Sequence, residues 1–396
     1  MGAISRYLQC VFEASPNETN EFKKLLKQTV ILENIVLTGL RGVGKTVLLE
    51  TFKPVAIKEG WLWAGTDLSE SSSISEEALA IRLLSDLSLA TNSIVVNKYP
   101  ETKIGFSREI ENKLITLNYQ TLFSIYGNTP GLISDKIKNV LEVVWDCIKD
   151  KGPRGIVFAY DEAQNLSDHA SKDQFPLSIL LDIFQSIQRK NIPFMLVLTG
   201  LPTLFPKLVE ARTFAERMFH VIFLDKLDKK PSRQAILKPI EENKSISLSD
   251  ESVNAIIDMS GGYPYFIQFI CREVYDAFIQ KLSKGEQAIV PTTEIIQKLD
   301  TDFFYGRWAR ATDRQRELLE VIAKLNNSSS EFSVQEIVES SKKLIHKPFS
   351  SSHVNQMLSS LINSGLIYKN RHGKYSFAVP MLDKYILRQM KDVADA

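Results

Sequence analysis

The chain has 396 residues, of which 44% are apolar and 24% are charged, and its formal net charge is +1. These values are ordinary for a globular protein and exclude the disordered and collagen-like classes, while the length is enough for two or three domains. The charge is unevenly spread, because residues 307–396 contain 14 Lys and Arg against 9 Asp and Glu. The C-terminal part is therefore the basic part of the chain.

The three cysteines, Cys10, Cys147 and Cys271, are far apart and form no CxxC pair. We expect buried free thiols in a reducing compartment, because this spacing is typical neither of a metal site nor of a redox motif. The apolar runs at 156–160 and 194–198 are too short to span a bilayer, and the first residues lack the apolar segment of a signal peptide. The prediction is a cytoplasmic protein with no membrane partner.

In chain order, residues 1–33 are predicted to form one or two short helices with a break at Ser15-Pro16-Asn17. Asn34–Thr38 is the first predicted core strand. It leads into a glycine-spaced turn and then a helix from about Lys45 to Phe52, which Pro54 should end. A strand, a turn that closes in Lys-Thr and a helix are the setting of a phosphate-binding loop.

This loop is Gly39-Leu40-Arg41-Gly42-Val43-Gly44-Lys45-Thr46, with Val47 directly after it. A triphosphate is bound by successive backbone N–H groups at a helix N-terminus, and glycines allow the positive φ and the close approach that this requires. Lys45 would place its ammonium group between the terminal phosphates. The Thr46 hydroxyl would be a magnesium ligand.

Between this loop and the next motif, we predict a strand at Trp61–Ala64 with both tryptophans on its core face, and helices at Ser75–Thr91 and Ile133–Lys149. The helix at Ser75–Thr91 is expected to bury Leu79, Ile81, Leu83, Leu84 and Leu87. Residues 92–131 contain several helix and strand breakers, so they are predicted to be an insertion.

The second chemical motif is the apolar run Gly155–Tyr160 followed by Asp161 and Glu162. Such a run is typical of a central parallel strand buried on both faces, and buried carboxylates are costly unless a cation or ligand needs them. Asp161 would hold magnesium through water, and Glu162 would orient and deprotonate the attacking water. A further buried strand at Pro193–Gly200 carries Thr199, which is either a sensor of the γ-phosphate or an ordinary cap.

Arg212 and Arg217 follow, just before a predicted strand at Phe219–Leu224. They are either solvated or used to stabilise transition-state charge across a subunit boundary, for which we favour Arg217. Strands and helices alternate over Asn34–Leu224, which predicts the α/β class with a doubly wound parallel sheet.

After Pro231 the predicted strands stop. Helices at about Ser232–Asn243, Asp250–Ser260, Pro264–Leu282 and Thr292–Phe304 predict an α-helical lid. From Thr312 onward, three helices precede two short strands at Gly365–Lys369 and Lys374–Val379. Three helices followed by a hairpin are typical of a winged helix.

Duplex DNA is a predicted partner of this last domain. Short polar side chains at the start of its recognition helix suit phosphates or base edges: Ser350, Ser351, Ser352, His353, Asn355 and Gln356. A basic hairpin tip with Arg371, His372 and Lys374 suits the DNA backbone or minor groove. The alternative is that the serines are ordinary helix caps and that the tip is merely polar.

Taken together, these motifs resemble those of AAA+ ATPases, in particular the origin-recognition-like branch, the transposon target-selection ATPases and the STAND signalling ATPases. The resemblance covers Asn34 to Leu387. It rests on GLRGVGKT (Gly39–Thr46), YDEAQNL (Tyr160–Leu166), LTGLP (Leu198–Pro202), the arginine segment Ala211–Arg217 and the terminal winged helix. It implies ATP and Mg²⁺ as ligands, Walker A at Gly39–Thr46, Walker B at Asp161 and Glu162, sensor one at Thr199 and an arginine finger at Arg217 or Arg212.

The chain departs from this pattern at the second sensor. Initiators carry an arginine a few residues into the late lid helix, whereas this chain has Gly261-Gly262-Tyr263-Pro264, which is closer to the STAND pattern. Arg272, later in the same helix, is a weak candidate. GTP is disfavoured, because Asp225-Lys226-Leu227-Asp228 lacks the leading Asn of the guanine-reading motif.

The expected organisation is an N-terminal helical segment (1–33), an ATPase core (34–228, with the insertion at 92–131), a lid (229–305) and a winged helix (306–396). One functional hypothesis is an enzyme that hydrolyses ATP to control assembly on or loading onto DNA, as a nucleotide-dependent homo-oligomer. The other is a STAND-like signalling switch whose winged helix is regulatory or binds an unknown protein partner, without DNA.

Overall fold

The computed structural model describes residues 16–102, 110–241, 247–283 and 289–394. These residues form two compact units. The first, called the sheet unit below, comprises Ser15–Thr38 and Lys45–Phe223. The second, called the C-terminal unit, includes Gly39–Gly44 and Leu224–Ala396. Each unit is described by itself.

The strands of the sheet unit are β1 (Asn34–Gly39), β2 (Leu62–Ala64), β3 (Val95–Thr102), β4 (Ile110–Thr116), β5 (Ile156–Tyr160), β6 (Phe194–Gly200) and β7 (Phe219–Leu224). Its helices are α2 (Pro16–Leu26), α3 (Lys45–Lys58), α4 (Glu76–Thr91), α5 (Tyr119–Asn128), α6 (Ile133–Ile148), α7 (Pro176–Arg189), α8 (Leu204–Ala211) and α9 (Ala215–Met218). Helix α4 begins where the sequence predicts, because the Ser75 hydroxyl accepts a hydrogen bond from the Ala78 N–H at 3.1 Å.

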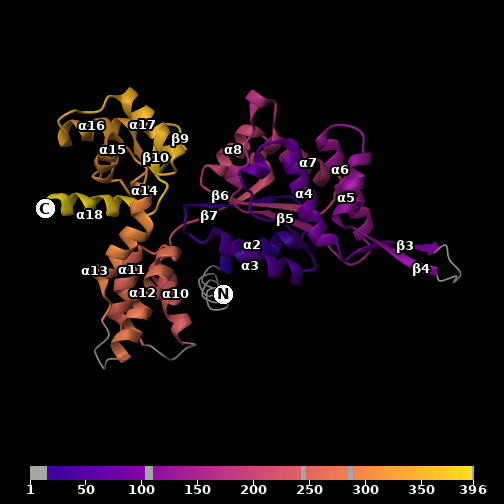
Figure 1. The fold of residues 1–396 in the computed structure, drawn as a ribbon, viewed down its shortest axis with the longest axis horizontal. Helices are drawn as coiled ribbons and strands as arrows, with labels where there is room; N and C mark the ends of the chain where they lie inside the picture. The colour runs from indigo at the N-terminus through magenta and orange to yellow at the C-terminus, as the bar shows by residue number, and fades with distance from the viewer. Residues whose placement is uncertain (1–15, 103–109, 242–246, 284–288, 395–396) are drawn as a thin grey trace. The chain divides into compact units, whose positions relative to one another are not determined.

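The central sheet has five strands in the order β2-β5-β6-β1-β7, and the pairs β2–β5, β5–β6 and β6–β1 run parallel. Helices α2 and α3 lie on one face of this sheet, and α4 to α7 lie on the other (Figure 1). Every residue of β1, β5 and β6 is buried, because strands covered on both faces have no side exposed to water. The predicted α/β class with a doubly wound parallel sheet is confirmed.

The strand order also decides where the site lies. In a parallel sheet the carboxyl ends of neighbouring strands meet at one edge. Leu37 of β1 is in register with Thr199 of β6, and Tyr160 of β5 is in register with Leu198 of β6. The end of β1, the end of β5 and Thr199 are therefore brought together at that edge.

Two predictions about helices of the sheet unit were wrong. Pro54 does not end the helix, since α3 continues to Lys58 with Pro54 inside it. The proline is exposed, and buried Phe52 and Ala56 hold the helix against the core on both sides of it. Ile81 of α4 is 41% exposed rather than buried, because at about 100° per residue it falls opposite the stripe formed by the buried leucines of this helix.

Of the two tryptophans predicted to lie on the core face, Trp61, directly before β2, is buried, whereas Trp63 within β2 is not. Trp61 is 2% exposed and donates its indole N–H to the Leu26 carbonyl at 3.1 Å. Trp63 is only partly buried, since β2 is the outer strand of the sheet. Cys147 and Cys271 are both partly exposed rather than buried. Cys10 lies outside the described residues.

The predicted insertion at 92–131 contains the antiparallel hairpin β3–β4 and helix α5. The hairpin extends away from the central sheet (Figure 1). At its base, the Thr91 hydroxyl lies 2.9 Å from the carbonyl oxygens of both Leu87 and Leu117. This contact connects the end of α4 to the strand that returns from the hairpin.

The helices of the C-terminal unit are α10 (Lys229–Glu241), α11 (Asp250–Ser260), α12 (Pro264–Ser283), α13 (Thr292–Leu299), α14 (Gly306–Trp308), α15 (Asp313–Ala323), α16 (Val334–Leu344), α17 (Ser351–Asn363) and α18 (Leu382–Ala394). Its strands β8 (Phe332–Ser333), β9 (Ile367–Arg371) and β10 (Lys374–Phe377) form an antiparallel sheet in the order β8-β10-β9. The elements from α15 to β10 thus follow the order helix, strand, helix, helix, hairpin. Strand β8 and helix α18 were not predicted from the sequence.

None of the helices in the described ranges is long and apolar enough to cross a membrane.

Candidate functional site

The glycine-spaced loop joins β1 to α3 and takes the conformation that its glycines allow. Gly42 and Gly44 have φ values of +80° and +95°, a region in which residues with a Cβ are strained. Helix α3 begins at Lys45. The N–H groups of its first turn have no acceptors within the helix, which is the arrangement that binds an anion.

The side chains of this loop differ in exposure. Val43 is 3% exposed and Lys45 is 9% exposed, whereas Arg41 and Thr46 lie at the surface. Leu40 and Val47 are partly buried, and the Val47 carbonyl accepts the Thr51 hydroxyl at 2.9 Å within α3. Val43 therefore fixes the loop to apolar surroundings, while the Thr46 hydroxyl remains accessible to a ligand.

Asp161, at the end of β5, is the centre of the site. Its Oδ2 accepts a hydrogen bond from the Thr46 hydroxyl at 2.5 Å, and its Oδ1 accepts one from the Thr199 hydroxyl at 2.5 Å. The Glu162 backbone N–H also donates to Oδ1, at 2.8 Å. Asp161 is 4% exposed, so these three donors satisfy a carboxylate that is largely shielded from water.

The structure thus brings together Thr46, Asp161 and Thr199, three of the residues that the sequence indicates. Thr199 is buried completely and also lies 3.2 Å from the Tyr160 carbonyl. Its hydroxyl is directed at Asp161, beside the hydroxyl of Thr46.

Hard oxygen ligands suit magnesium, which keeps several waters and binds one or two protein groups plus phosphate oxygens. A hydroxyl and a carboxylate oxygen 2.5 Å apart at the start of α3 fit that requirement. Among the residues that the structure describes, no three His, Cys, Asp or Glu side chains gather into a metal cluster. The Thr46 hydroxyl and the Asp161 carboxylate thus fit a magnesium ion held together with phosphates.

Glu162 has a backbone conformation that is rare for a residue with a side chain. Its φ and ψ are +51° and +33°, in the left-handed region. The Glu162 carboxylate is exposed and accepts a hydrogen bond from the side-chain N–H of Gln164. Strain of this kind persists where surrounding contacts fix the backbone, and here the turn Ala163–Asn165 follows directly.

The two candidate arginine fingers occupy different environments. Arg212 donates two hydrogen bonds to Asp182, at 2.9 and 2.8 Å, and a third to the Ser178 hydroxyl at 2.9 Å. The hydrogen bond to Asp182 raises the pKa of Arg212 further. Arg217 is exposed, and the structure gives its side chain no partner among the described residues. Arg212 is thus engaged within its own chain, and Arg217 is available to another.

The weak candidate for a second sensor, Arg272, pairs with its neighbour Glu273 at 3.1 Å and is 64% exposed. A different arginine of the C-terminal unit lies in a pocket. The pocket is lined by Arg41, Gly42, Tyr263, Tyr265, Phe266, Phe303 and Arg307. Burial lowers the pKa of Arg307, and repulsion from the charge of Arg41 lowers it further. Sequence reasoning missed Arg307, since no motif surrounds it.

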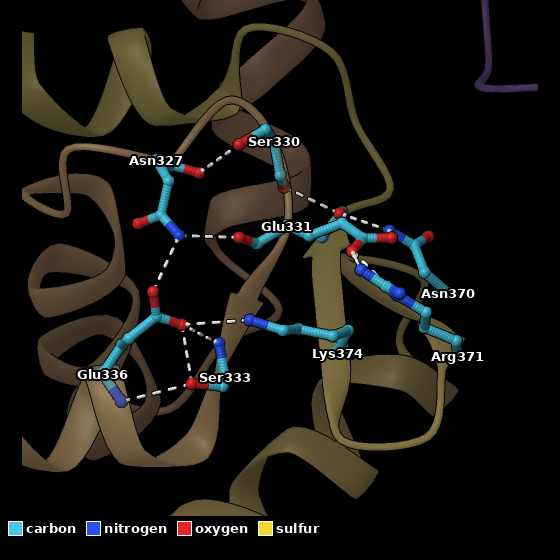
Figure 2. Close-up of polar contacts among 9 residues, drawn as sticks. Asn327, Ser330, Glu331, Ser333, Glu336, Asn370, Arg371 and Lys374 are labelled. Carbon is cyan, nitrogen blue, oxygen red and sulfur yellow. Dashed lines mark hydrogen bonds and ion pairs between the residues drawn. The ribbon is translucent and has the colours of Figure 1, made fainter.

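The predicted basic tip of the hairpin is neutralised within the chain (Figure 2). Arg371 donates two hydrogen bonds to Glu331 Oε2, at 3.1 and 2.8 Å. Lys374 lies 3.6 Å from Glu336 Oε2, an oxygen that also accepts the Ser333 N–H at 2.7 Å. The hydrogen bond from Arg371 lowers the pKa of Glu331. These two ion pairs could not be foreseen from the sequence, because the acids lie 38 to 40 residues from Arg371 and Lys374 in the chain.

The polar residues expected at the start of the recognition helix lie on α17. Ser350 is its N-cap and accepts the His353 N–H at 3.3 Å, as the alternative interpretation predicts. Ser351, Ser352, His353, Asn355 and Gln356 are exposed. The Asn355 amide donates to the Ser351 carbonyl at 2.9 Å, so its acceptor oxygen is directed elsewhere. Three lysines lie exposed before this helix: Lys342, Lys343 and Lys347.

Comparison with known proteins supports the fold. The Walker-type ATPase PABY2304 of Pyrococcus abyssi is similar over 93% of this chain and 94% of its own, with 16% identity and a TM-score of 0.55. The Aeropyrum pernix ORC2 protein in its ADP form is similar over 96% and 94%, with 12% identity and a TM-score of 0.51. At these identities the similarity shows the fold alone. The chain therefore has the α/β fold of a P-loop NTPase.

Residues 301–386 match a family described as "Domain of unknown function (DUF8462)". None of the curated proteins compared with the chain matches it in sequence.

Proposed function

We propose that this protein is an AAA+ ATPase that binds ATP with Mg²⁺ at Gly39–Val47 and hydrolyses it. The observation that carries the proposal is the Asp161 carboxylate, which accepts hydrogen bonds at 2.5 Å from both Thr46 and Thr199. One hydroxyl comes from the phosphate loop and the other from the neighbouring strand. The names of the similar solved structures, a Walker-type ATPase and an ORC2 protein in its ADP form, agree with this class.

Each residue has a distinct part in the proposed reaction. Mg²⁺, held by Thr46 and through water by Asp161, would supply charge neutralisation at the phosphate oxygens. Gly39–Gly44 contribute backbone N–H groups, and the ammonium group of Lys45 binds the terminal phosphates. Glu162 accepts the proton of the attacking water, and Thr199 and Asp161 fix the edge of the sheet against which the phosphate lies. Arg217 of a neighbouring copy stabilises the charge of the transition state.

Two substitutions test this assignment. Lys45→Ala should abolish ATP binding, and Glu162→Gln should leave ATP binding intact but lower the turnover number by about 100-fold or more, since a positioned general base contributes roughly 10²–10⁴-fold. Binding is measured with a fluorescent ATP analogue and turnover by phosphate release. The matched control is Glu142→Gln, since Glu142 lies on α6, away from the site, and is paired with Lys190. Unchanged turnover in Glu162→Gln would falsify its role as the base.

We further propose that the region from α15 to β10 is a winged helix that contacts duplex DNA. Exposed ion pairs contribute only about 0–1 kcal/mol, so DNA phosphates can replace Glu331 and Glu336 as partners of Arg371 and Lys374. Positive charge near the recognition helix would also attract the DNA phosphates. It comes from three lysines that precede this helix in the chain: Lys342, Lys343 and Lys347. Ser351 and Asn355 are the proposed contacts on the helix itself.

A STAND-like switch without DNA is the second candidate. The observation in its favour is the pairing of Arg371 with Glu331 and of Lys374 with Glu336, because a hairpin neutralised within its own chain gives little attraction for a polyanion. Sizing of Glu162→Gln with ATP, with and without duplex DNA, separates the two. A DNA-dependent assembly that weakens with salt supports the first function. An ATP-dependent assembly that DNA does not change supports the second.

A further inference from the structure

Gln164 connects the Glu162 carboxylate to the end of β6, the strand that carries Thr199. It lies in the single turn Ala163–Asn165, two residues after Glu162. Its side-chain N–H₂ donates to Glu162 Oε2. Its side-chain oxygen accepts the Leu201 backbone N–H at 3.1 Å. Leu201 directly follows the end of β6, the strand that carries Thr199.

The orientation of the Gln164 amide follows from its partners. A backbone N–H is only a donor, so the atom that faces Leu201 must be the oxygen. The N–H₂ group is then necessarily the end that faces Glu162, whose ionised carboxylate only accepts. Exchange of the two ends would place donor against donor and oxygen against oxygen. The contact with Leu201 and the contact with Glu162 therefore require the same orientation of the Gln164 amide.

The surrounding residues leave room for this amide and fix the turn that carries it. A Cβ on Gly200 would lie 2.7 Å from the Gln164 side-chain oxygen, which is inside contact distance. The Lys207 ammonium donates to the Gln164 carbonyl at 2.8 Å, and the Asn165 amide donates to the Leu68 carbonyl at 2.8 Å. The backbone of the turn is thus held on both sides, and the absence of a side chain at Gly200 is what admits the glutamine.

The effect on Glu162 is to fix a side chain that is otherwise exposed. A solvated glutamate samples several rotamers, and ordering such a side chain costs up to about 1.5–2 kcal/mol. The hydrogen bond from Gln164 holds Oε2, whereas Oε1 has no protein partner among the described residues. One oxygen is therefore anchored, and the other remains able to accept a proton from water.

We infer that Gln164 is a positioning residue for the general base, and that it ties the Glu162 carboxylate to the end of β6. The inference rests on the proposed ATPase function. Gln164 contacts neither phosphate nor water in this role and acts only through Glu162. Movement at the end of β6 would be passed through the Leu201 N–H to the carboxylate that accepts the proton.

Two substitutions distinguish the contribution of the amide oxygen from that of the amide N–H₂ group. Gln164→Ala removes both contacts. Gln164→Glu keeps an acceptor for the Leu201 N–H but places a negative oxygen against Glu162. Gln174→Glu is the matched control, because the Gln174 side chain also accepts a backbone N–H, that of Glu76 at 3.0 Å, and lies outside the site.

The first measurement uses no nucleotide. Hydrogen exchange of the Leu201 amide, resolved by NMR, should become faster in Gln164→Ala and remain near the wild-type rate in Gln164→Glu. The second is steady-state ATP hydrolysis together with the Kd of a non-hydrolysable ATP analogue. Both variants should lose about 10–100-fold in kcat, since a small displacement of a reacting group costs up to about 10²-fold. KM and Kd should change by less than about twofold.

The inference is overturned if Gln164→Glu keeps a kcat within about twofold of wild type, if either variant raises kcat, or if the loss appears in Kd. It is also overturned if Leu201 exchange is the same in Gln164→Ala and wild type. Wild-type protein that binds ATP but does not hydrolyse it would instead contradict the proposed function, and the exchange measurement would still report on the contact. The two failures are thus distinguishable.

Discussion

The hydrogen bond between Thr199 and Asp161 gives the most direct physical test of the site. Thr199 is fully buried, and its hydroxyl lies 2.5 Å from a carboxylate oxygen. Thr199→Val keeps the shape of the side chain and removes only the donor. A hydrogen bond to a charged group contributes about 1.5–3 kcal/mol, so the free energy of unfolding of the sheet unit should fall by about that amount.

Thr91 is a matched control in the same unit. It is also fully buried, and its hydroxyl lies 2.9 Å from two carbonyl oxygens, those of Leu87 and Leu117. Its acceptors are neutral, so Thr91→Val should cost only about 0.5–1.5 kcal/mol. Thr199→Val should therefore lose more free energy of unfolding than Thr91→Val. Thr199→Ser keeps the hydroxyl, so it should regain most of that extra loss.

The assay is urea unfolding followed by tryptophan fluorescence. The chain has four tryptophans, and only Trp308 lies in the C-terminal unit. In a Trp308→Phe background, the signal reports on the sheet unit alone, and the midpoint at constant m gives the change in stability. If Thr199→Val costs no more than Thr91→Val, the Asp161 carboxylate does not depend on this donor and the reasoning is refuted.

Three further predictions concern other parts of the chain. Arg217→Ala should lower ATP turnover without changing the melting temperature. Arg212→Ala should destabilise the protein by about 0.5–1 kcal/mol, because Arg212 holds Asp182 within its own chain. Equal thermal stability of the two variants would contradict this. The double substitution of Glu331 and Glu336 by Gln should strengthen DNA binding at low salt by several-fold, measured by fluorescence anisotropy, and unchanged affinity would show that the hairpin does not meet DNA. Burial raises the pKa of Tyr263 to about 12, so its stabilising contribution is complete below the unfolded value of about 10 and is lost as the pH rises from about 10 to about 12. Tyr263→Phe should therefore flatten the loss of stability between pH 9 and pH 11, and an identical slope would exclude this source.

The amino-acid sequence by itself determined the class of fold and most elements of the site. The apolar strands at Asn34–Thr38, Gly155–Tyr160 and Pro193–Gly200 are buried on both faces, and a continuous apolar run is sufficient to show that. The glycine spacing of the loop is local chemistry, since positive φ at Gly42 and Gly44 requires glycine at those positions. Thr199 could be named as a candidate from the sequence, but the sequence left open whether it is a sensor or an ordinary cap.

Only the tertiary structure decided how these pieces are arranged. The order β5-β6-β1 brings the Thr46 and Thr199 hydroxyls within hydrogen-bond distance of Asp161. Strand order depends on long-range pairing that no local pattern encodes. The same holds for the charges. Arg371 lies forty residues from Glu331 in the chain, so its neutralisation could not be seen in the sequence, where the hairpin is simply basic. Gln164 is one polar residue among many in YDEAQNL until the fold brings Leu201 against its amide. The pairing of Arg212 within its own chain likewise follows only from the placement of Asp182 beside it.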